Sequence, residues 1–265
     1  MFNGQSSGYK REMTARSISM STPIRYLLFD LGGTLMHARG DWEPVHDRAD
    51  AALARTLSDY NINLDAQVFR TRLHEYYDQR DKDFQETTYH FVLRELLKEF
   101  GYDEIPESVL RSALDALYLI TQKNWELESD TIETLERLKA ENYRLGIFSN
   151  AGDDKDVQDL VESFGIRHHF DFVLTSAACF YRKPHLRAFE IALARWNATP
   201  AEAVMIGDSL EADIVGAKQA GMISIWITRR AQFKDEDIRR IKPDFSLRKL
   251  SELLPTLERI AISRR

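Results

Sequence analysis

The sequence predicts an α/β protein, in which a doubly wound, mostly parallel sheet carries a helical bundle inserted after its first strand. From residue 131 onward, apolar runs of strand length alternate with segments of helical spacing. This is the pattern of parallel strands joined by helices. Earlier in the chain, the apolar run Tyr26 to Phe29 is followed by about 85 residues with helical spacing only. These two observations predict the sheet and its insert.

Composition and charge are those of an ordinary globular protein. The 265 residues are 43% hydrophobic and 29% charged, and this length is ample for a core with a smaller insert. The formal net charge of −6 argues against nucleic acid or an anionic membrane as a partner. Cys179 is the only cysteine, and no apolar run approaches the ~20 residues that span a bilayer. We expect a cytoplasmic protein, either a monomer or a homodimer.

The first 23 residues are expected to form a disordered N-terminal extension. They are rich in Ser and Thr and poor in apolar residues. They also lack the apolar segment of a secretory signal. We therefore exclude residues 1–23 from the folded part of the chain.

Four stretches after the first strand place apolar residues on one face of a helix. They are Val45 to Tyr60, Phe69 to Tyr77, Val92 to Phe100 and Val109 to Tyr118. Pro106 lies just before the last stretch, a position typical of the first helical turn. The short connections predict a helical bundle over residues 38–125.

The remaining segments, residues 24–37 and 126–265, are assigned to the sheet and its covering helices. In chain order we expect a helix around Leu135, a strand at 144–149, a helix at 157–164, a strand at 172–175, a helix at 184–196, a strand at 204–206, a helix at 210–220, a strand at 223–227, a short strand near 245 and a closing helix to 260. The segment Thr199 to Glu202 has the spacing of a capping box.

Four predicted strand ends carry polar residues that would converge at one site. They are Asp30-Leu-Gly-Gly-Thr34, Ser149-Asn150, Lys183 before Pro184, and Gly207-Asp208-Ser209 with Asp213 one turn later. The carboxyl ends of parallel strands meet at one edge of a sheet, where ligands bind. We therefore expect these side chains to converge, while Arg182 beside Lys183 is assigned no role.

Such a set suits phosphoryl transfer assisted by a hard cation. Two carboxylates and a backbone carbonyl offer oxygen ligands to Mg²⁺, and a lysine adds positive charge that offsets the repulsion between a carboxylate and a phosphate. Ser149 and the N–H groups of the Gly33-Thr34 turn would hold phosphate oxygens. Asp30 could then attack the phosphorus and form an aspartyl-phosphate.

The four motifs, in this order, resemble those of the haloacid dehalogenase superfamily of hydrolases, which has a Rossmann-like core. The resemblance covers the chain from Arg25 to about Ile260, and the helical bundle resembles the cap that one subfamily inserts between its first and second motifs. Gly207-Asp208-Ser209, followed by Asp213 and Gly216-Ala217, is the most specific part of the match.

This resemblance implies roles residue by residue. Asp30 matches the nucleophile and a metal ligand, the carbonyl of Gly32 and the carboxylate of Asp208 match further Mg²⁺ ligands, and Asp213 matches the supporting acid. Gly33, Thr34, Ser149, Asn150 and Lys183 match phosphate-binding positions, and Lys183 is also assigned a catalytic role. The implied activity is a phosphatase acting on a small phosphorylated metabolite.

The match fails at Gly32, where phosphatases of the family normally carry a second aspartate that protonates the leaving group and activates water. General acid–base catalysis is typically worth about 10²–10⁴-fold in rate. On this interpretation, Gly32→Asp should raise turnover of alkyl phosphates if the turn tolerates a side chain. Asp41, His37 and His46 are within sequence reach as replacement proton donors.

Three explanations for Gly32 stay open. The protein is a phosphatase that takes its proton from elsewhere, or a hydrolase of carbon–halogen or carbon–phosphorus bonds, or a catalytically weak protein that binds a phosphorylated ligand. The haloacid branch of the family does not require the metal site, whereas Asp208 and Asp213 are present here.

Overall fold

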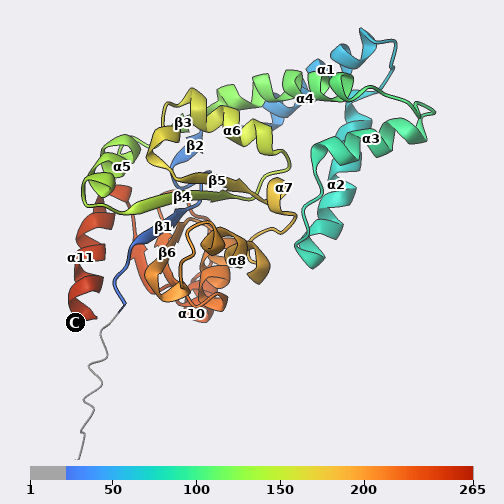
Figure 1. Ribbon diagram of the computed structural model, residues 1–265. Helices are drawn as coiled ribbons and strands as arrows, with labels where there is room; N and C mark the ends of the chain where they lie inside the picture. Colours follow the sequence, from blue (N-terminus) through green and yellow to red (C-terminus); the bar gives the residue numbers. More distant parts are fainter. Residues whose placement is uncertain (1–21, 265) are drawn as a thin grey trace, which may run out of the picture.

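The computed structural model describes residues 22–264, and its centre is a six-stranded sheet in the order β5-β4-β1-β6-β7-β8 (Figure 1). All five neighbouring pairs are parallel. The strands are β1 (Tyr26–Phe29), β4 (Arg144–Ser149), β5 (Phe172–Thr175), β6 (Ala203–Gly207), β7 (Ile223–Ile227) and β8 (Phe245–Leu247). The predicted parallel sheet is confirmed, and β1 lies between β4 and β6 at its centre.

Helices cover both faces of this sheet. One face packs against α5 (Thr131–Ala140), α6 (Asp154–Ser163) and α11 (Leu253–Ser263), and the other against α8 (Leu186–Ala194) and α9 (Gly216–Gln219). Neighbouring residues of β1 alternate between the two cores, since Leu27 packs in the first and Leu28 in the second. Both faces of the central strands are therefore buried, which is the physical reason for their continuous apolar runs.

The predicted insert consists of four helices with a core of their own. They are α1 (Trp42–Ser58), α2 (Ala66–Asp83), α3 (Tyr89–Glu99) and α4 (Glu107–Thr121), and their shared apolar cluster includes Leu53, Phe69, Leu93 and Leu114. Figure 1 shows α1 and α4 side by side, leading away from the sheet, and α2 and α3 turning back toward α7 (Ser176–Cys179). Tyr60 was expected on the first helix, but it follows the end of α1 and is exposed.

A small antiparallel sheet connects the insert to the rest of the chain. It pairs β2 (Met36–Ala38) with β3 (Trp125–Leu127). The sequence did not predict these strands, because three residues are too few to show alternation. The predicted boundaries at residues 38 and 125 both fall within this pair.

Three local features refine the predicted elements. The expected helix at 210–220 starts as a π-helical turn, Leu210–Val215, and continues as α9. The helix expected from residue 184 begins at Leu186, and the short helix α10 (Asp235–Ile241) was not predicted. The capping box is present, since the Glu202 carboxylate accepts hydrogen bonds from the N–H and hydroxyl of Thr199.

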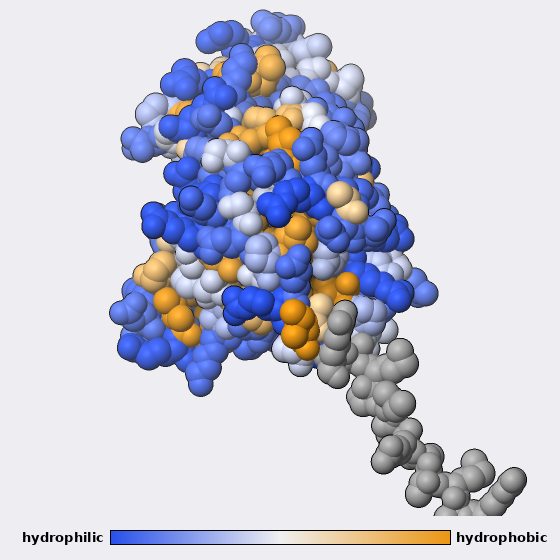
Figure 2. All heavy atoms as spheres, turned by 90° about the vertical axis from the view of Figure 1, so that its left-hand side faces the viewer, coloured by the Kyte–Doolittle hydropathy of each residue, from blue (hydrophilic) through white to orange (hydrophobic). Residues whose placement is uncertain are grey.

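The surface that Figure 2 shows is largely hydrophilic, with hydrophobic residues in small separate groups. Within residues 22–264, no helix has the length and apolar character needed to cross a membrane. The predicted disorder of the N-terminal extension concerns residues that, up to position 21, lie outside the described part of the chain.

Candidate active site

Two carboxylates meet at one edge of the sheet because β1 and β6 are parallel and in register. Phe29 pairs with Ile206, so Asp30 and Asp208 follow neighbouring strand ends. The N–H of Asp30 donates to the carbonyl of Ile206 over 2.8 Å, which extends the pairing by one residue. Carboxylate oxygens of Asp30, Asp208 and Asp213 lie within 4.8 Å of one another.

Lys183 lies buried between two of these carboxylates. Only 3% of the residue is exposed, and its Nζ is 2.6 Å from Asp30 Oδ1, 2.7 Å from Asp213 Oδ1 and 2.8 Å from the carbonyl oxygen of Phe148. Burial by itself would lower the pKa of Lys183, but the carboxylates of Asp213 and Asp30 outweigh it and raise the pKa. The ammonium group therefore stays charged and holds Asp30 in place.

Asn150 fixes the loop that carries this lysine. Its Oδ1 accepts from the backbone N–H of Lys183 over 2.8 Å, and its Nδ2 donates to the carbonyl of Lys183 over 3.0 Å. Ser149 lines the cavity next to Asp30, and its hydroxyl forms no hydrogen bond to the described residues, which leave out the side chains of residues 79–81. The predicted pair thus divides into a positioning amide and a hydroxyl that faces the cavity.

The Asp208 carboxylate is placed to hold a cation. Within the described chain no basic side chain forms an ion pair with it, whereas Lys183 pairs with both other carboxylates. Burial, followed by the charges of Asp30 and Asp213, raises the pKa of Asp208 to about 8. A divalent cation bound here would offset this repulsion, so the residues fit the predicted metal.

Asp213 supports the site. Besides its ion pair with Lys183, its Oδ2 accepts from the N–H of Ser209 over 2.9 Å. Burial raises the pKa of Asp213 to about 6, and the Lys183 ammonium opposes that shift. This carboxylate is therefore occupied by protein donors, in contrast to that of Asp208.

Gly33 and Thr34 shape the turn but do not line the cavity that contains Asp30. The N–H of Gly33 donates to the carbonyl of Met36 over 2.7 Å, and Thr34 is 1% exposed. Gly33 has a φ of +81°, and a Cβ there would lie 2.2 Å from Asp208 Oδ2. The structure thus explains Gly33 by this close approach and a left-handed backbone, and the phosphate-binding role of the two residues stays a prediction.

The indole ring of Trp125 covers Gly32. A Cβ at Gly32 would lie 3.1 Å from Cη2 and 3.4 Å from Cζ3 of that ring. Gly32 and Trp125 both line the cavity of about 430 Å³ that contains Asp30, Ser149 and Asp208. The ring of Trp125 therefore lies next to the position from which the missing aspartate side chain would extend into the cavity.

An aromatic cavity of about 370 Å³ adjoins the first, between the insert and the sheet. Its rings include Trp42, which packs on Trp125 at 5.1 Å, and Tyr89, which stacks on Tyr118 at 5.9 Å. The residues that line both cavities are Trp125, Asn150, Ala151, Asp156 and Arg182. Sequence reasoning missed Trp125, Asp156 and Arg182, because only the fold brings insert and sheet together.

The residues considered as replacement proton donors lie in different surroundings. Asp41 is exposed at the start of α1 and lines neither cavity. His37 Nδ1 is 3.3 Å from the Glu128 carboxylate. His46 lines the aromatic cavity and stacks on Trp42, and burial, then the charge of Arg70, lowers its pKa.

Residues 55–227 match the family model described as haloacid dehalogenase-like hydrolase. This is a haloacid dehalogenase-like hydrolase. The predicted membership is confirmed, and the match includes the greater part of the insert together with Ser149, Lys183, Asp208 and Asp213.

Relatives of this haloacid dehalogenase-like hydrolase differ in their named activities. It is 35% identical over 228 residues to a glyceraldehyde 3-phosphate phosphatase from Methanothermobacter thermautotrophicus, covering 81% of this chain and 90% of the relative. Among solved structures, it resembles a 2-haloacid dehalogenase from Pseudomonas syringae pv. Tomato, with a TM-score of 0.69 and 26% identity over 89% of this chain and 99% of that one. A HAD phosphatase from Thermococcus onnurineus gives 0.60 and 28% identity over 88% and 98%.

In this haloacid dehalogenase-like hydrolase, the loop between α2 and α3 of the insert lies against the segment that precedes Lys183. The N–H of Glu86 donates to the carbonyl of Phe180 over 2.9 Å, and the N–H of Arg182 donates to the carbonyl of Phe84 over 2.8 Å. The buried Glu86 carboxylate also accepts from Ser176 Oγ and from Arg182 Nη1. These contacts hold the insert next to Lys183.

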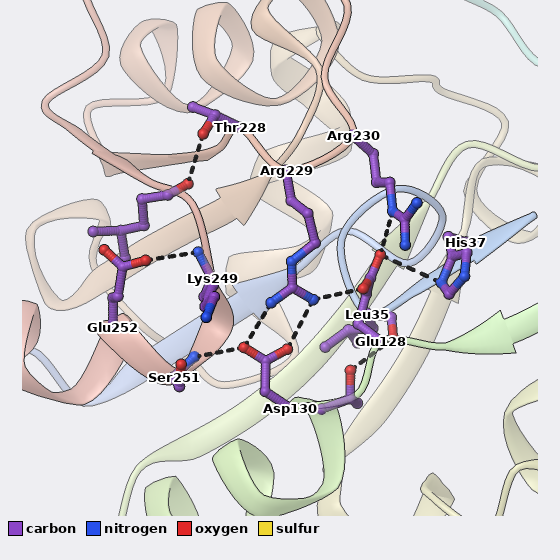
Figure 3. A network of polar contacts seen from close by, with 12 residues as sticks. Leu35, His37, Glu128, Asp130, Thr228, Arg229, Arg230, Lys249, Ser251 and Glu252 are labelled. Atoms are coloured by element: carbon purple, nitrogen blue, oxygen red, sulfur yellow. Dashed lines mark hydrogen bonds and ion pairs between the residues drawn. The ribbon is translucent and has the colours of Figure 1, made fainter.

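A second set of contacts anchors the segment that follows β3 (Figure 3). The Glu128 carboxylate lies 2.5 Å from Arg229, 2.8 Å from Arg230 and 3.3 Å from His37, while Asp130 accepts two hydrogen bonds from Arg229. Burial tends to raise the pKa of Glu128, but the hydrogen bonds from the two arginines prevail and lower it. This network joins the return strand of the insert to the end of β7.

Proposed function

We propose that this hydrolase is a Mg²⁺-dependent phosphatase that removes phosphate from a small phosphorylated metabolite. The observation that carries the proposal is the pairing of Asp30 with Lys183 while the neighbouring Asp208 carboxylate has no basic partner in the described chain. The glyceraldehyde 3-phosphate phosphatase relative supports it, since that activity also acts on a small phosphate ester.

In the proposed reaction Asp30 is the nucleophile. One carboxylate oxygen attacks the phosphorus, the ester bond breaks, and an aspartyl-phosphate forms. Lys183 keeps the carboxylate oriented, and the Ser149 hydroxyl is placed to donate to a phosphate oxygen. Mg²⁺, held by Asp30, Asp208 and the Gly32 carbonyl, would offset the charge of the phosphate as the carboxylate approaches.

A second candidate, hydrolysis of a carbon–halogen bond, is favoured by one observation. Gly32 provides no carboxyl group to protonate a leaving group, and a halide leaves without a proton. The 2-haloacid dehalogenase structure resembles this chain over nearly its full length. However, attack on a neutral carbon needs no cation to offset phosphate charge, which would leave the Asp208 carboxylate without a role.

The test is phosphate release from glyceraldehyde 3-phosphate, glycerol 3-phosphate and p-nitrophenyl phosphate, with Mg²⁺ and with EDTA. We expect turnover that requires both the metal and Asp30, with Asp30→Asn inactive. Release of halide from 2-chloropropionate without metal would favour the second candidate instead. Absence of turnover with every compound would reject both enzymatic proposals and favour a protein that binds a phosphorylated ligand.

A further inference from the structure

The geometry points to Asp156 as the residue that protonates the leaving group, in place of the carboxylate missing at Gly32. This inference rests on the phosphatase proposed above and deepens it. Asp156 lies in the first turn of α6 and lines both the cavity with Asp30 and the aromatic cavity. Among the described residues that line both cavities, it carries the one carboxyl group.

The position between the cavities matches the bond that must break. A phosphate group next to Asp30 and Ser149 occupies the first cavity, and the rest of the ester then extends into the aromatic cavity. The ester oxygen lies at the junction of the two, where Asp156 and Trp125 form part of the wall. A carboxyl group at that junction faces the leaving oxygen rather than the phosphate oxygens.

The structure also shows why the proton donor has to come from elsewhere than residue 32. The ring of Trp125 lies where a side chain at Gly32 would begin, with Cη2 3.1 Å from the Cβ position. Trp125 is in turn packed on Trp42. A side chain at residue 32 would therefore have to displace this indole by a few tenths of an ångström within a packed pair of rings.

The surroundings of Asp156 suit a group that both gives and takes a proton near neutral pH. Burial raises its pKa to about 7, although the Gln122 amide, whose Nε2 lies 2.9 Å from Asp156 Oδ1, favours the charged form. Of the charges facing it from α4 and α6, Asp153 and Asp159 raise the pKa and Arg111 lowers it. A donor whose pKa is near the working pH is the most efficient general acid–base catalyst.

The neighbouring candidates are less suited to this role. Asp153 is bound to Arg111, with 2.7 Å between Oδ2 and Nη1. His46 lines the aromatic cavity but not the cavity with Asp30, and its lowered pKa leaves it mostly neutral at pH 7. Burial raises the pKa of the Tyr118 hydroxyl well above its usual value, so it is a poor acid.

The proposed proton steps balance over the reaction. As an Asp30 oxygen forms its bond to phosphorus, the bond to the ester oxygen breaks and that oxygen takes the proton of the Asp156 carboxyl group. Water then attacks the phosphorus of the aspartyl-phosphate and gives its proton to the Asp156 carboxylate. The Asp30–phosphorus bond breaks, and the products are an alcohol and inorganic phosphate.

The experiment compares Asp156→Asn with the matched control Asp159→Asn. Asp159 is an exposed carboxylate on the same helix, it pairs with Lys155, and it lines neither cavity. The amide that Asp156→Asn introduces can still accept the hydrogen bond from Gln122, and thermal unfolding checks that both variants fold. Asp156→Glu retains a carboxyl group and is expected to recover part of the activity.

Two phosphate esters separate proton donation from other roles. Glycerol 3-phosphate has a leaving group that needs a proton, so Asp156→Asn should lower its kcat by about 10²–10⁴-fold. With p-nitrophenyl phosphate the first step needs no proton, so the variant should release p-nitrophenol in a burst and then turn over slowly. The fall of kcat/KM for glycerol 3-phosphate above pH 7 in the native protein should be absent in Asp156→Asn.

Several results would overturn the assignment while leaving the phosphatase intact. If Asp156→Asn raises KM for glycerol 3-phosphate and leaves kcat unchanged, Asp156 binds substrate and donates no proton. An equal loss in Asp159→Asn, or equal losses on both esters without a burst, would also contradict it. If the native protein itself releases no phosphate from either ester, the proposed phosphatase fails first and the assignment of Asp156 fails with it.

Discussion

The indole ring of Trp125 covers Gly32 in the candidate active site, with its Cη2 atom 3.1 Å from where a Cβ of residue 32 would be. Trp125 is the first residue of β3, the strand by which the chain returns from the insert. The φ angle of Gly32 lies outside the left-handed region. The ring, and not the backbone, therefore limits which side chain residue 32 can carry.

This relationship changes what we expect of Gly32→Asp. With Trp125 in place, the substitution should lower the free energy of unfolding by ~1–3 kcal/mol through overpacking and give no gain in turnover of glycerol 3-phosphate. Adding Trp125→Leu should recover stability and raise turnover above that of Trp125→Leu alone. Urea unfolding and a double-mutant cycle measure the coupling. A single Gly32→Asp variant with native stability and higher turnover would contradict this account.

Lys183→Met should be strongly destabilising as well as inactive. It removes the cation between Asp30 and Asp213 and leaves two buried carboxylates without a cationic partner, which typically costs ~3–5 kcal/mol. Lys155→Met is the control, because Lys155 pairs with carboxylates at the surface and such pairs contribute ~0–1 kcal/mol. Urea unfolding of both variants at pH 7 measures the difference. Equal stabilities would mean that the buried ion pairs contribute no more than the exposed ones.

The raised pKa of Asp156 predicts a pH dependence of stability that is independent of any activity. Burial raises the pKa from 3.8 in the unfolded chain to about 7, so between these values the folded state binds more protons than the unfolded state. The contribution of Asp156 to the free energy of unfolding therefore falls as pH rises from about 4 to 7 and stays at the lower value above pH 7.

Asp156→Asn removes this contribution. The free energy of unfolding of the variant minus that of the native protein should be larger at pH 8 than at pH 4. The expected increase is on the order of 1–4 kcal/mol, at ~1.4 kcal/mol per pKa unit. Asp159→Asn keeps the Asp156 carboxyl group and removes only a neighbouring charge, so the same difference should be much smaller in this variant. Urea unfolding at the two pH values decides, and parallel pH profiles for Asp156→Asn and the native protein would argue against a buried, proton-binding carboxyl group.

Glu86→Ala should loosen the insert from the sheet without unfolding either. The substitution leaves Arg182 and Ser176 without the carboxylate that they share, while the backbone hydrogen bonds to Phe180 and from Arg182 can still form. Amide hydrogen exchange at residues 84–89 and 180–182 should accelerate, by about tenfold for each 1.4 kcal/mol lost. The exposed Glu104→Ala serves as control, and unchanged exchange in Glu86→Ala would show that the backbone contacts alone hold the loop.

The sequence determined the parts of this protein that depend on local pattern. Continuous apolar runs such as Leu145 to Phe148 required strands buried on both faces, and apolar spacing such as that of Val109 to Tyr118 required an amphipathic helix. The order of polar residues after these strands predicted that Asp30, Lys183, Asp208 and Asp213 converge, and the structure brings them together.

Only the tertiary structure decided which residues outside the predicted motifs surround that centre. Trp125 is far from Gly32 along the chain, and nothing near Asp156 distinguishes it from the other carboxylates of its helix. Their roles depend on how the insert is oriented, which the contacts of Glu86 and the anchor around Glu128 determine. Such contacts are set by packing between distant segments. Neither the spacing of apolar residues nor the composition shows which surfaces become neighbours when a bundle folds back on a sheet.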